Sequence, residues 1–267
     1  MTPTLVQKRG PQESAAAVLL KALSFLALAM LFEWALYKLF GAHFSKSITA
    51  ALKPVFGEYQ GFFAVAALAN AAFLFVLTWA FLTLDGQGLS AMGFGKRWRY
   101  QFWDGMILGF LPGLVLAVPL LLSTFAEIRA NTSSVPWVVL GVPCLALIST
   151  LQAGGYACRK LRSRFGGAAA VLIGAVFLTA AQRLIFFRQD QKLEDFVLAV
   201  VGEFVAYSLL ALASVRGGGL WLPAGLQLGL SLVPERGGFA YLWWSWERAR
   251  IFLCPASGVS DSEFHTC

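Results

Sequence analysis

Long apolar runs alternate with short polar stretches along almost the whole chain. Apolar runs occupy residues 15–40, 61–84, 102–125, 135–158, 166–187 and 196–215, and a shorter run occupies 219–233. A helix needs about 20 mainly apolar residues to cross the hydrocarbon of a membrane. The strict alternation of apolar and polar residues that is typical of strands is not seen. The pattern therefore predicts an all-α, polytopic membrane helix bundle of about seven or eight spans.

The stretches between the runs set the expected domain organisation. Polar connections are predicted at 41–60, 85–101, 126–134 and 188–195, and a basic turn at 159–164. Residues 1–14 and 254–267 are expected to be flexible, leaving 15–253 as one membrane domain. Trp and Tyr gather in residues 239–246, a composition typical of the boundary between hydrocarbon and headgroups. That stretch is expected to form an interfacial helix or a last, poorly inserted span.

Composition narrows the class of protein further. The 267 residues are 58% hydrophobic and 13% charged, with a mean hydropathy of +0.69. A soluble domain of this size normally carries about 25% charged residues, so a soluble fold is excluded. The net charge of +7 is divided among the polar connections. A nucleic-acid surface, which needs basic residues gathered on one face, is therefore not expected.

The basic residues predict an orientation instead. Basic residues in short loops stay on the cytoplasmic side. Residues 96–99 and 159–164 are strongly basic and are separated by two spans, so they fall on one side. Lys8 and Arg9 agree with that side, whereas the lysines of 41–60 oppose it. We expect an integral protein of a bacterial inner membrane with its N-terminus in the cytoplasm.

One stretch carries a family resemblance. Residues 149–166 read Ser-Thr-Leu-Gln-Ala-Gly-Gly-Tyr-Ala-Cys-Arg-Lys-Leu-Arg-Ser-Arg-Phe-Gly. This stretch resembles the first motif of the CPBP family, the CAAX-protease and bacteriocin-processing (Abi-like) membrane proteins. The family pattern is Glu-Glu, two residues, an aromatic, Arg-Gly-Tyr, and a basic stretch ending in Phe-Gly. Ser149 and Thr150 fall on the glutamates and Gly154 on the arginine, while the Gly-Tyr and Phe-Gly framework is kept.

Two later motifs of the family are matched in the same way. Counting from residues 165–166, the histidine of the second motif falls on Gln182. The stretch Gly-Leu-Trp-Leu-Pro at 219–223 resembles the entry to the last motif, whose histidine and asparagine fall on Gln227 and Ser231. The loop at 89–98 resembles the family's approach to its third span. The resemblance covers about residues 89–233 and implies a CPBP-like core there.

The chain departs from the family pattern at the positions of the family's catalytic residues. In the family, glutamates and histidines from different helices converge to bind a metal or activate water. Serine, threonine, glycine and glutamine neither take a proton from water nor shuttle one at neutral pH. The chain has 2 histidines, His43 and His265, and both lie outside the expected spans. We therefore expect no catalytic residues, no metal and no cofactor. Gln182, Gln227, Ser149, Thr150 and Ser231 are expected to form an uncharged cluster that holds the helices together.

Two acids, Glu33 and Glu203, lie well inside the apolar runs. Glu33 lies close to Lys38 near the end of its run, and a pair that reaches toward the membrane surface explains it. Glu203 is harder to explain, because charges in hydrocarbon are costly and often functional. Tyr207 lies one turn away on the same helix face, and Arg183 is the expected partner. These three residues form the candidate intramembrane polar site.

The function expected from these observations is non-catalytic. A degenerate CPBP-like protein would serve as an accessory or scaffold subunit of a membrane complex, with membrane lipids and other integral subunits as partners. Two alternatives remain open. One is an endopeptidase that uses other residues, such as Glu203 with Gln227, and whose activity would vanish with Glu203→Gln. The other is a lipid-binding protein that contacts an isoprenoid or pigment tail.

Overall fold

The computed structural model describes residues 13–94, 97–124, 137–185, 193–231, 234–235 and 238–239. The described chain is all-α apart from one two-residue antiparallel ladder. Its helices are α1 (Ala15–Trp34), α2 (Gly41–Leu84), α3 (Trp98–Thr124), α4 (Val142–Gly154), α5 (Tyr156–Phe165), α6 (Gly167–Ile185), α7 (Leu193–Gly217) and α8 (Trp221–Ser231). Short π-helical segments, η1 (Ala35–Phe40) and η4 (Trp137–Gly141), precede α2 and α4, and a 3-10 turn, η2 (Leu89–Met92), precedes α3. The ladder pairs β1 (Pro234–Glu235) with β2 (Gly238–Phe239).

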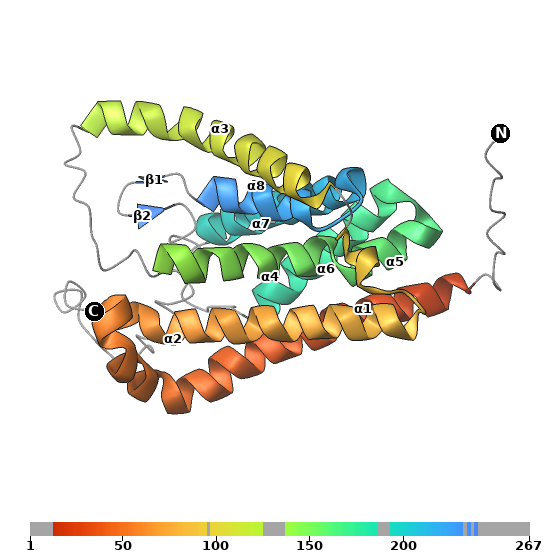
Figure 1. Ribbon diagram of the computed structural model, residues 1–267, viewed down its shortest axis with the longest axis horizontal. Coiled ribbons are helices and arrows are strands. Elements are labelled where there is room, and N and C mark those ends of the chain that lie inside the picture. Colours follow the sequence, from red (N-terminus) through yellow and green to blue (C-terminus); the bar gives the residue numbers. More distant parts are fainter. Residues whose placement is uncertain are drawn as a thin grey trace.

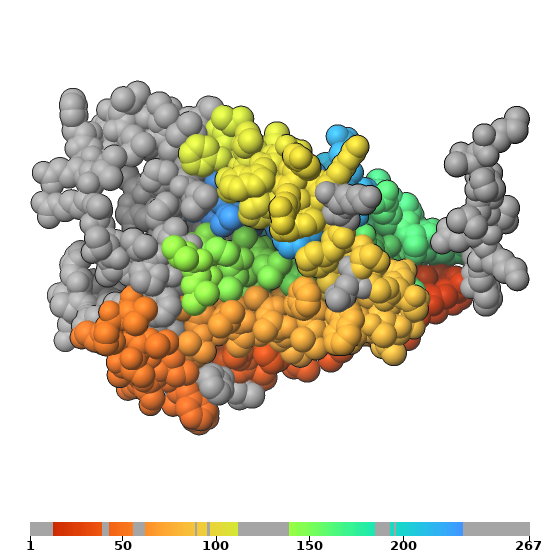
Figure 2. Space-filling view, viewed as in Figure 1, coloured from red at the N-terminus to blue at the C-terminus, as the bar shows by residue number. Residues whose placement is uncertain are grey.

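Five helical stretches of the described chain are long and apolar enough to cross a membrane. They are Ala15–Lys38, Phe62–Leu84, Val139–Phe165, Gly167–Leu184 and Phe196–Gly217. The expectation of an integral membrane protein built from helices is therefore supported. Figure 1 shows the helices lying roughly along one direction, and Figure 2 shows α4 as a strip between α2 and α3 on the same face.

Two predicted connections are helical in the structure. Residues 41–60 were expected to be a polar connection, but α2 begins at Gly41 and contains Pro54. The alanines and lysines of this stretch and its one leucine are good helix formers, and they outweigh its polarity. Residues 159–164 were expected to be a basic turn, but they belong to α5, which ends at Phe165 and is followed by Gly166 with φ of 83°. The expected flexible tail at 254–267, most of residues 239–253 and residues 1–12 lie outside the described part.

Basic residues of α5 complete the end of α7. The last carbonyls of a helix have no partner within it and need donors from elsewhere. Arg162 donates to the Val215 carbonyl at 2.8 Å, and Arg159 donates to the Gly218 carbonyl at 2.9 Å. Gln101 of α3 donates to the Gly217 carbonyl at 2.8 Å. The positively charged side chains of α5 therefore satisfy backbone carbonyls at the end of α7.

Glycines bring α3 and α8 into backbone contact. Each helix carries two glycines four residues apart, Gly105 and Gly109 on α3 and Gly225 and Gly229 on α8. A Cβ atom added at any of the four would lie 2.0–2.2 Å from a backbone carbonyl oxygen of the other helix. Small residues at this spacing allow close approach of helices in membranes. The two motifs interlock, so the position of α8 depends on all four glycines.

Candidate functional site

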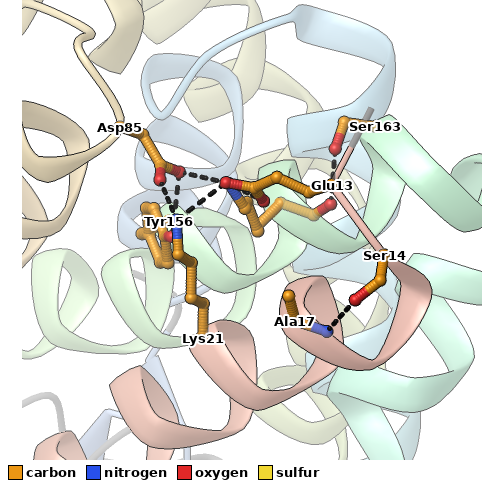
Figure 3. A network of polar contacts seen from close by, with 8 residues as sticks. Glu13, Ser14, Ala17, Lys21, Asp85, Tyr156 and Ser163 are labelled. Carbon is orange, nitrogen blue, oxygen red and sulfur yellow. Dashed lines mark hydrogen bonds and ion pairs between the residues drawn. The ribbon is translucent and has the colours of Figure 1, made fainter. Parts of the chain in front are cut away.

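A closed ring of opposite charges joins four segments at one end of the bundle (Figure 3). Lys21 Nζ of α1 lies 2.8 Å from Glu13 Oε1 and 2.8 Å from Asp85 Oδ1. Lys160 Nζ of α5 lies 2.8 Å from Glu13 Oε2 and 2.6 Å from Asp85 Oδ2. Each lysine thus bridges both carboxylates. The ring ties the segment before α1, α1 itself, the end of α2 and α5 together.

Asp85 anchors the ring on the side of the core. Its side chain is 6% exposed, and the Tyr156 hydroxyl donates a hydrogen bond to Asp85 Oδ2 at 2.9 Å. Burial by itself raises the pKa of Asp85, but hydrogen bonds from Lys160, Lys21 and Tyr156 together lower it by more, so the pKa lies below its ordinary value of 3.8. Hydrogen bonds from Lys160 and Lys21 also lower the pKa of Glu13. Both carboxylates are therefore ionised at neutral pH, and the charges of the ring cancel.

The sequence pattern did not single out this ring. Its members are up to 147 residues apart, since the first is Glu13 and the last is Lys160. Glu13 fell in a stretch expected to be flexible and Asp85 in a loop. The available signal was Lys21, a charge near the start of an apolar run, which requires a partner or access to the membrane surface. The partners became visible only when the ends of α1, α2 and α5 were brought together.

A second polar cluster lies inside the bundle. The Glu33 side chain of α1 accepts a hydrogen bond from Gln152 Nε2 of α4 at 2.8 Å and a longer one from Gln182 Nε2 of α6 at 3.4 Å. The amide of Gln182 also approaches the Met30 sulfur at 3.7 Å. Polar groups buried in an apolar interior are costly unless they are hydrogen-bonded. The cluster therefore holds α1, α4 and α6 in one register.

The placement of Glu33 corrects a prediction. We expected Glu33 and Lys38 to reach together toward the membrane surface, but Glu33 is 1% exposed and faces other helices. The prediction rested on the short separation of the two residues along one helix. It could not anticipate that Gln152 and Gln182, 119 and 149 residues away, turn their amides toward the same carboxyl group.

The expected contact between Arg183 and Glu203 is present. Arg183 Nε of α6 donates to Glu203 Oε2 of α7 at 2.9 Å, and Arg183 Nη2 binds the other carboxylate oxygen. Two parallel bonds of this kind fix both position and orientation. Tyr207 follows one turn later on α7 and is buried. Arg183 and Glu203 thus join α6 to α7, and a role for the three residues beyond helix pairing stays a prediction.

The positions that match the family motifs are distributed over three helices. Ser149, Thr150 and Gly154 lie on α4, Gln182 on α6, and Gln227 and Ser231 on α8. Ser149 Oγ donates to the Leu145 carbonyl at 3.1 Å, and Ser231 Oγ donates to the Gln227 carbonyl at 2.8 Å. These two bonds lie within single helices. Gln182 makes contacts between helices, as the expected helix-holding cluster required, but its described partners are Glu33 and Met30.

Gly154 is a contact between helices. A Cβ atom at this position would lie 2.6 Å from the Ser214 Cβ of α7. Ser214 Oγ donates to the Gly154 carbonyl at 2.8 Å. The next residue, Gly155, separates α4 from α5, and a Cβ there would lie 2.1 Å from the Leu151 carbonyl oxygen. At the position that matches the arginine of the family, α7 therefore fills the space that a side chain would need.

We expect Gln152 to be the main support of the Glu33 cluster. Gln152→Leu should lower the free energy of unfolding by about 1–3 kcal/mol, because it removes the 2.8 Å hydrogen bond that the buried Glu33 carboxyl group accepts from Gln152. Thermal unfolding of the purified protein in detergent measures this. Gln227→Leu is the control, because Gln227 is only partly buried on α8. Equal losses for the two variants would mean that the contact with Glu33 adds nothing.

The described residues contain no group of three or more His, Cys, Asp or Glu side chains arranged to hold a metal ion. No family model matches the chain, and neither a curated protein nor a solved structure matches it. The functional assignment therefore depends on the geometry of this chain and on the motif resemblance.

Proposed function

We propose that this chain is a non-catalytic membrane protein of CPBP-like architecture that serves as an accessory or scaffold subunit of a membrane complex. The proposed bundle has seven or eight spans in a bacterial inner membrane, with the N-terminus in the cytoplasm. Other integral membrane subunits and lipids are its partners. It works by presenting a fixed helical surface and not by cutting a peptide bond.

The packing at Gly154 is the observation that carries this proposal. An arginine at this position would need room for a long side chain, but even a Cβ atom would collide with Ser214 of α7. The two positions that match the glutamate pair, Ser149 and Thr150, are buried within the bundle. At Gly154, helix packing fills the space that the arginine of the family would need. This supports a protein in which the motif positions serve helix packing and not catalysis.

The outer surface supports a role in assembly. Large apolar side chains of α7 are exposed along one face, among them Val197, Leu198, Val201, Val205 and Leu209. In a membrane such a face lies against lipid or against helices of another subunit. The Arg183–Glu203 pair fixes α7 against α6, so this face keeps its shape. A rigid apolar face of this kind suits a subunit that positions its neighbours.

The rival hypothesis is an endopeptidase that uses Glu203. A general base must be free to accept a proton from an attacking water. Both carboxylate oxygens of Glu203 bind the Arg183 guanidinium group. A water molecule would therefore have to displace the guanidinium group before Glu203 could accept its proton. The geometry therefore favours the scaffold over the peptidase.

Native size is the decisive measurement. We expect the protein extracted from its own membranes in mild detergent to migrate as a large, defined assembly. Mass spectrometry of that assembly should find stoichiometric integral membrane partners. The same extract in a dissociating detergent gives the size of the single chain as the control. Migration as a monomer or a simple homo-oligomer would contradict the scaffold proposal and lead to peptide cleavage assays on wild type and Glu203→Gln.

A further inference from the structure

The Glu13 carboxylate occupies a position that an external anion would fit. One of its oxygens lies 2.8 Å from Lys21 Nζ and the other lies 2.8 Å from Lys160 Nζ. We propose that these two lysines form an oxyanion-binding site, that Glu13 fills the site from within the chain, and that the external ligand is the phosphate of an anionic lipid headgroup. Lys160 lies in the basic stretch of the first family motif, but the site uses none of the positions at which the family's catalytic residues fall, and it does not depend on the proposed function.

The two ammonium groups are held in place from the core side. Asp85 binds Lys21 through one carboxylate oxygen at 2.8 Å and Lys160 through the other at 2.6 Å. Tyr156 donates to Asp85 at 2.9 Å, and the Lys160 side chain is only 12% exposed. The lysines therefore do not depend on Glu13 for their positions. A site whose donors are fixed in advance loses little entropy when a ligand binds.

Glu13 is the replaceable member of the ring. Its side chain is 39% exposed, compared with 6% for Asp85. Ion pairs between exposed side chains contribute little net free energy. Without Glu13, two lysines and Asp85 leave one positive charge. A phosphate group brings more negative charge and more acceptor oxygens than the single carboxylate that it would replace, and lysine binds phosphate as a point charge.

The depth of the ring favours a lipid as the source of the phosphate. Glu13 lies two residues before the candidate span Ala15–Lys38, and Asp85 directly follows the candidate span Phe62–Leu84. Headgroups lie just beyond the hydrocarbon that such spans cross. Anionic headgroups attract basic residues at this boundary. The ring thus lies at the depth at which headgroup phosphates are found.

The test compares wild type with Glu13→Gln, both as the full chain purified in detergent. The probes are inorganic phosphate and phosphatidylglycerol, with phosphatidylcholine as the lipid without net charge. Binding is measured by the rise in the thermal unfolding midpoint and by native mass spectrometry of retained lipid. Glu13→Gln should bind phosphatidylglycerol roughly three- to tenfold more tightly, because it removes an internal competitor from the site. Adding Lys160→Gln to Glu13→Gln should abolish that gain.

Arg164→Gln provides the matched control, because Arg164 is an exposed cation of α5 that stands outside the ring. Combined with Glu13→Gln, it should leave the gain in place. A gain with both probes supports a general oxyanion site, whereas a gain with phosphatidylglycerol alone supports a headgroup site in the bilayer. Equal affinities of wild type and Glu13→Gln for both probes would overturn the proposal, even if Lys160→Gln does not fold. Equal losses from Lys160→Gln and Arg164→Gln would also overturn it, because a diffuse basic surface would explain them.

Discussion

Gly225→Ala should destabilise this protein strongly, although it adds only a single methyl group. A Cβ atom at position 225 would lie 2.0 Å from the Phe102 carbonyl oxygen and 2.8 Å from the Met106 nitrogen. Both contacts are backbone atoms, which do not move aside as a flexible side chain does. Accommodation requires α3 and α8 to separate along their length. We expect a loss of about 3 kcal/mol or more in the free energy of unfolding, in the range of severe overpacking.

Two other glycines provide matched controls for that experiment. Gly174 of α6 and Gly202 of α7 are also helical, and an added Cβ meets nothing within 4 Å at either position. Alanine there should be neutral or stabilising by about 0.5–1 kcal/mol, because alanine loses less backbone entropy in a helix. Thermal unfolding of the three variants in one detergent measures the contrast. If Gly225→Ala unfolds at the same temperature as Gly202→Ala, the close contact of α3 with α8 is wrong.

Asp85→Asn should have the second largest effect. The change leaves Lys160, with its mostly buried side chain, without its shortest ion pair, and it weakens the acceptor for Tyr156. Removing one partner of a buried ion pair costs up to about 3–5 kcal/mol. Because Lys21 is 40% exposed, water compensates part of this loss. We expect a loss of about 2–3 kcal/mol at neutral pH, measured as unfolding in detergent.

Asp85 should also make the free energy of unfolding depend on pH in the acid range. The pKa of Asp85 is lowered in the folded protein, so the unfolded chain takes up a proton at higher pH than the folded one. The stabilisation is complete above about pH 4, the ordinary range of an aspartate. It is lost as the pH falls below that range toward the folded value. Wild type should therefore lose stability on acidification more steeply than Asp85→Asn.

The class of fold could be predicted from the sequence, because the thickness of the membrane hydrocarbon sets the length of each apolar run. The runs at 61–84 and 166–187 correspond closely to the candidate spans Phe62–Leu84 and Gly167–Leu184. The prediction failed for residues 41–60 and 159–164, where polarity was read as a loop. Lysine and arginine are good helix formers, and a charged helix is stable once its charges find partners. Those partners belong to other helices and leave no local pattern.

In the candidate site, too, contacts between neighbouring parts of the sequence could be predicted, whereas contacts between distant parts could not. Glu203 and Arg183 were expected to pair, and their helices α6 and α7 are consecutive. Glu33 was assigned to its local neighbour Lys38, although Gln152 of α4 lies 2.8 Å from it. The ring around Asp85 connects four segments and was not expected. Pairing between consecutive helices can be inferred from an alternating topology, whereas contacts of α1 with α4, α5 and α6 require the packing itself.

The arginines that complete α7 also bear on the order in which the protein is made. Synthesis proceeds from the N-terminus, so Arg159 and Arg162 are in the chain before the Val215 and Gly218 carbonyls that they cap. The last turn of α7 therefore meets donors that already exist when it leaves the ribosome. Unsatisfied backbone groups are costly beside hydrocarbon. The basic helix α5 thus supplies hydrogen-bond donors that are synthesised before the end of α7.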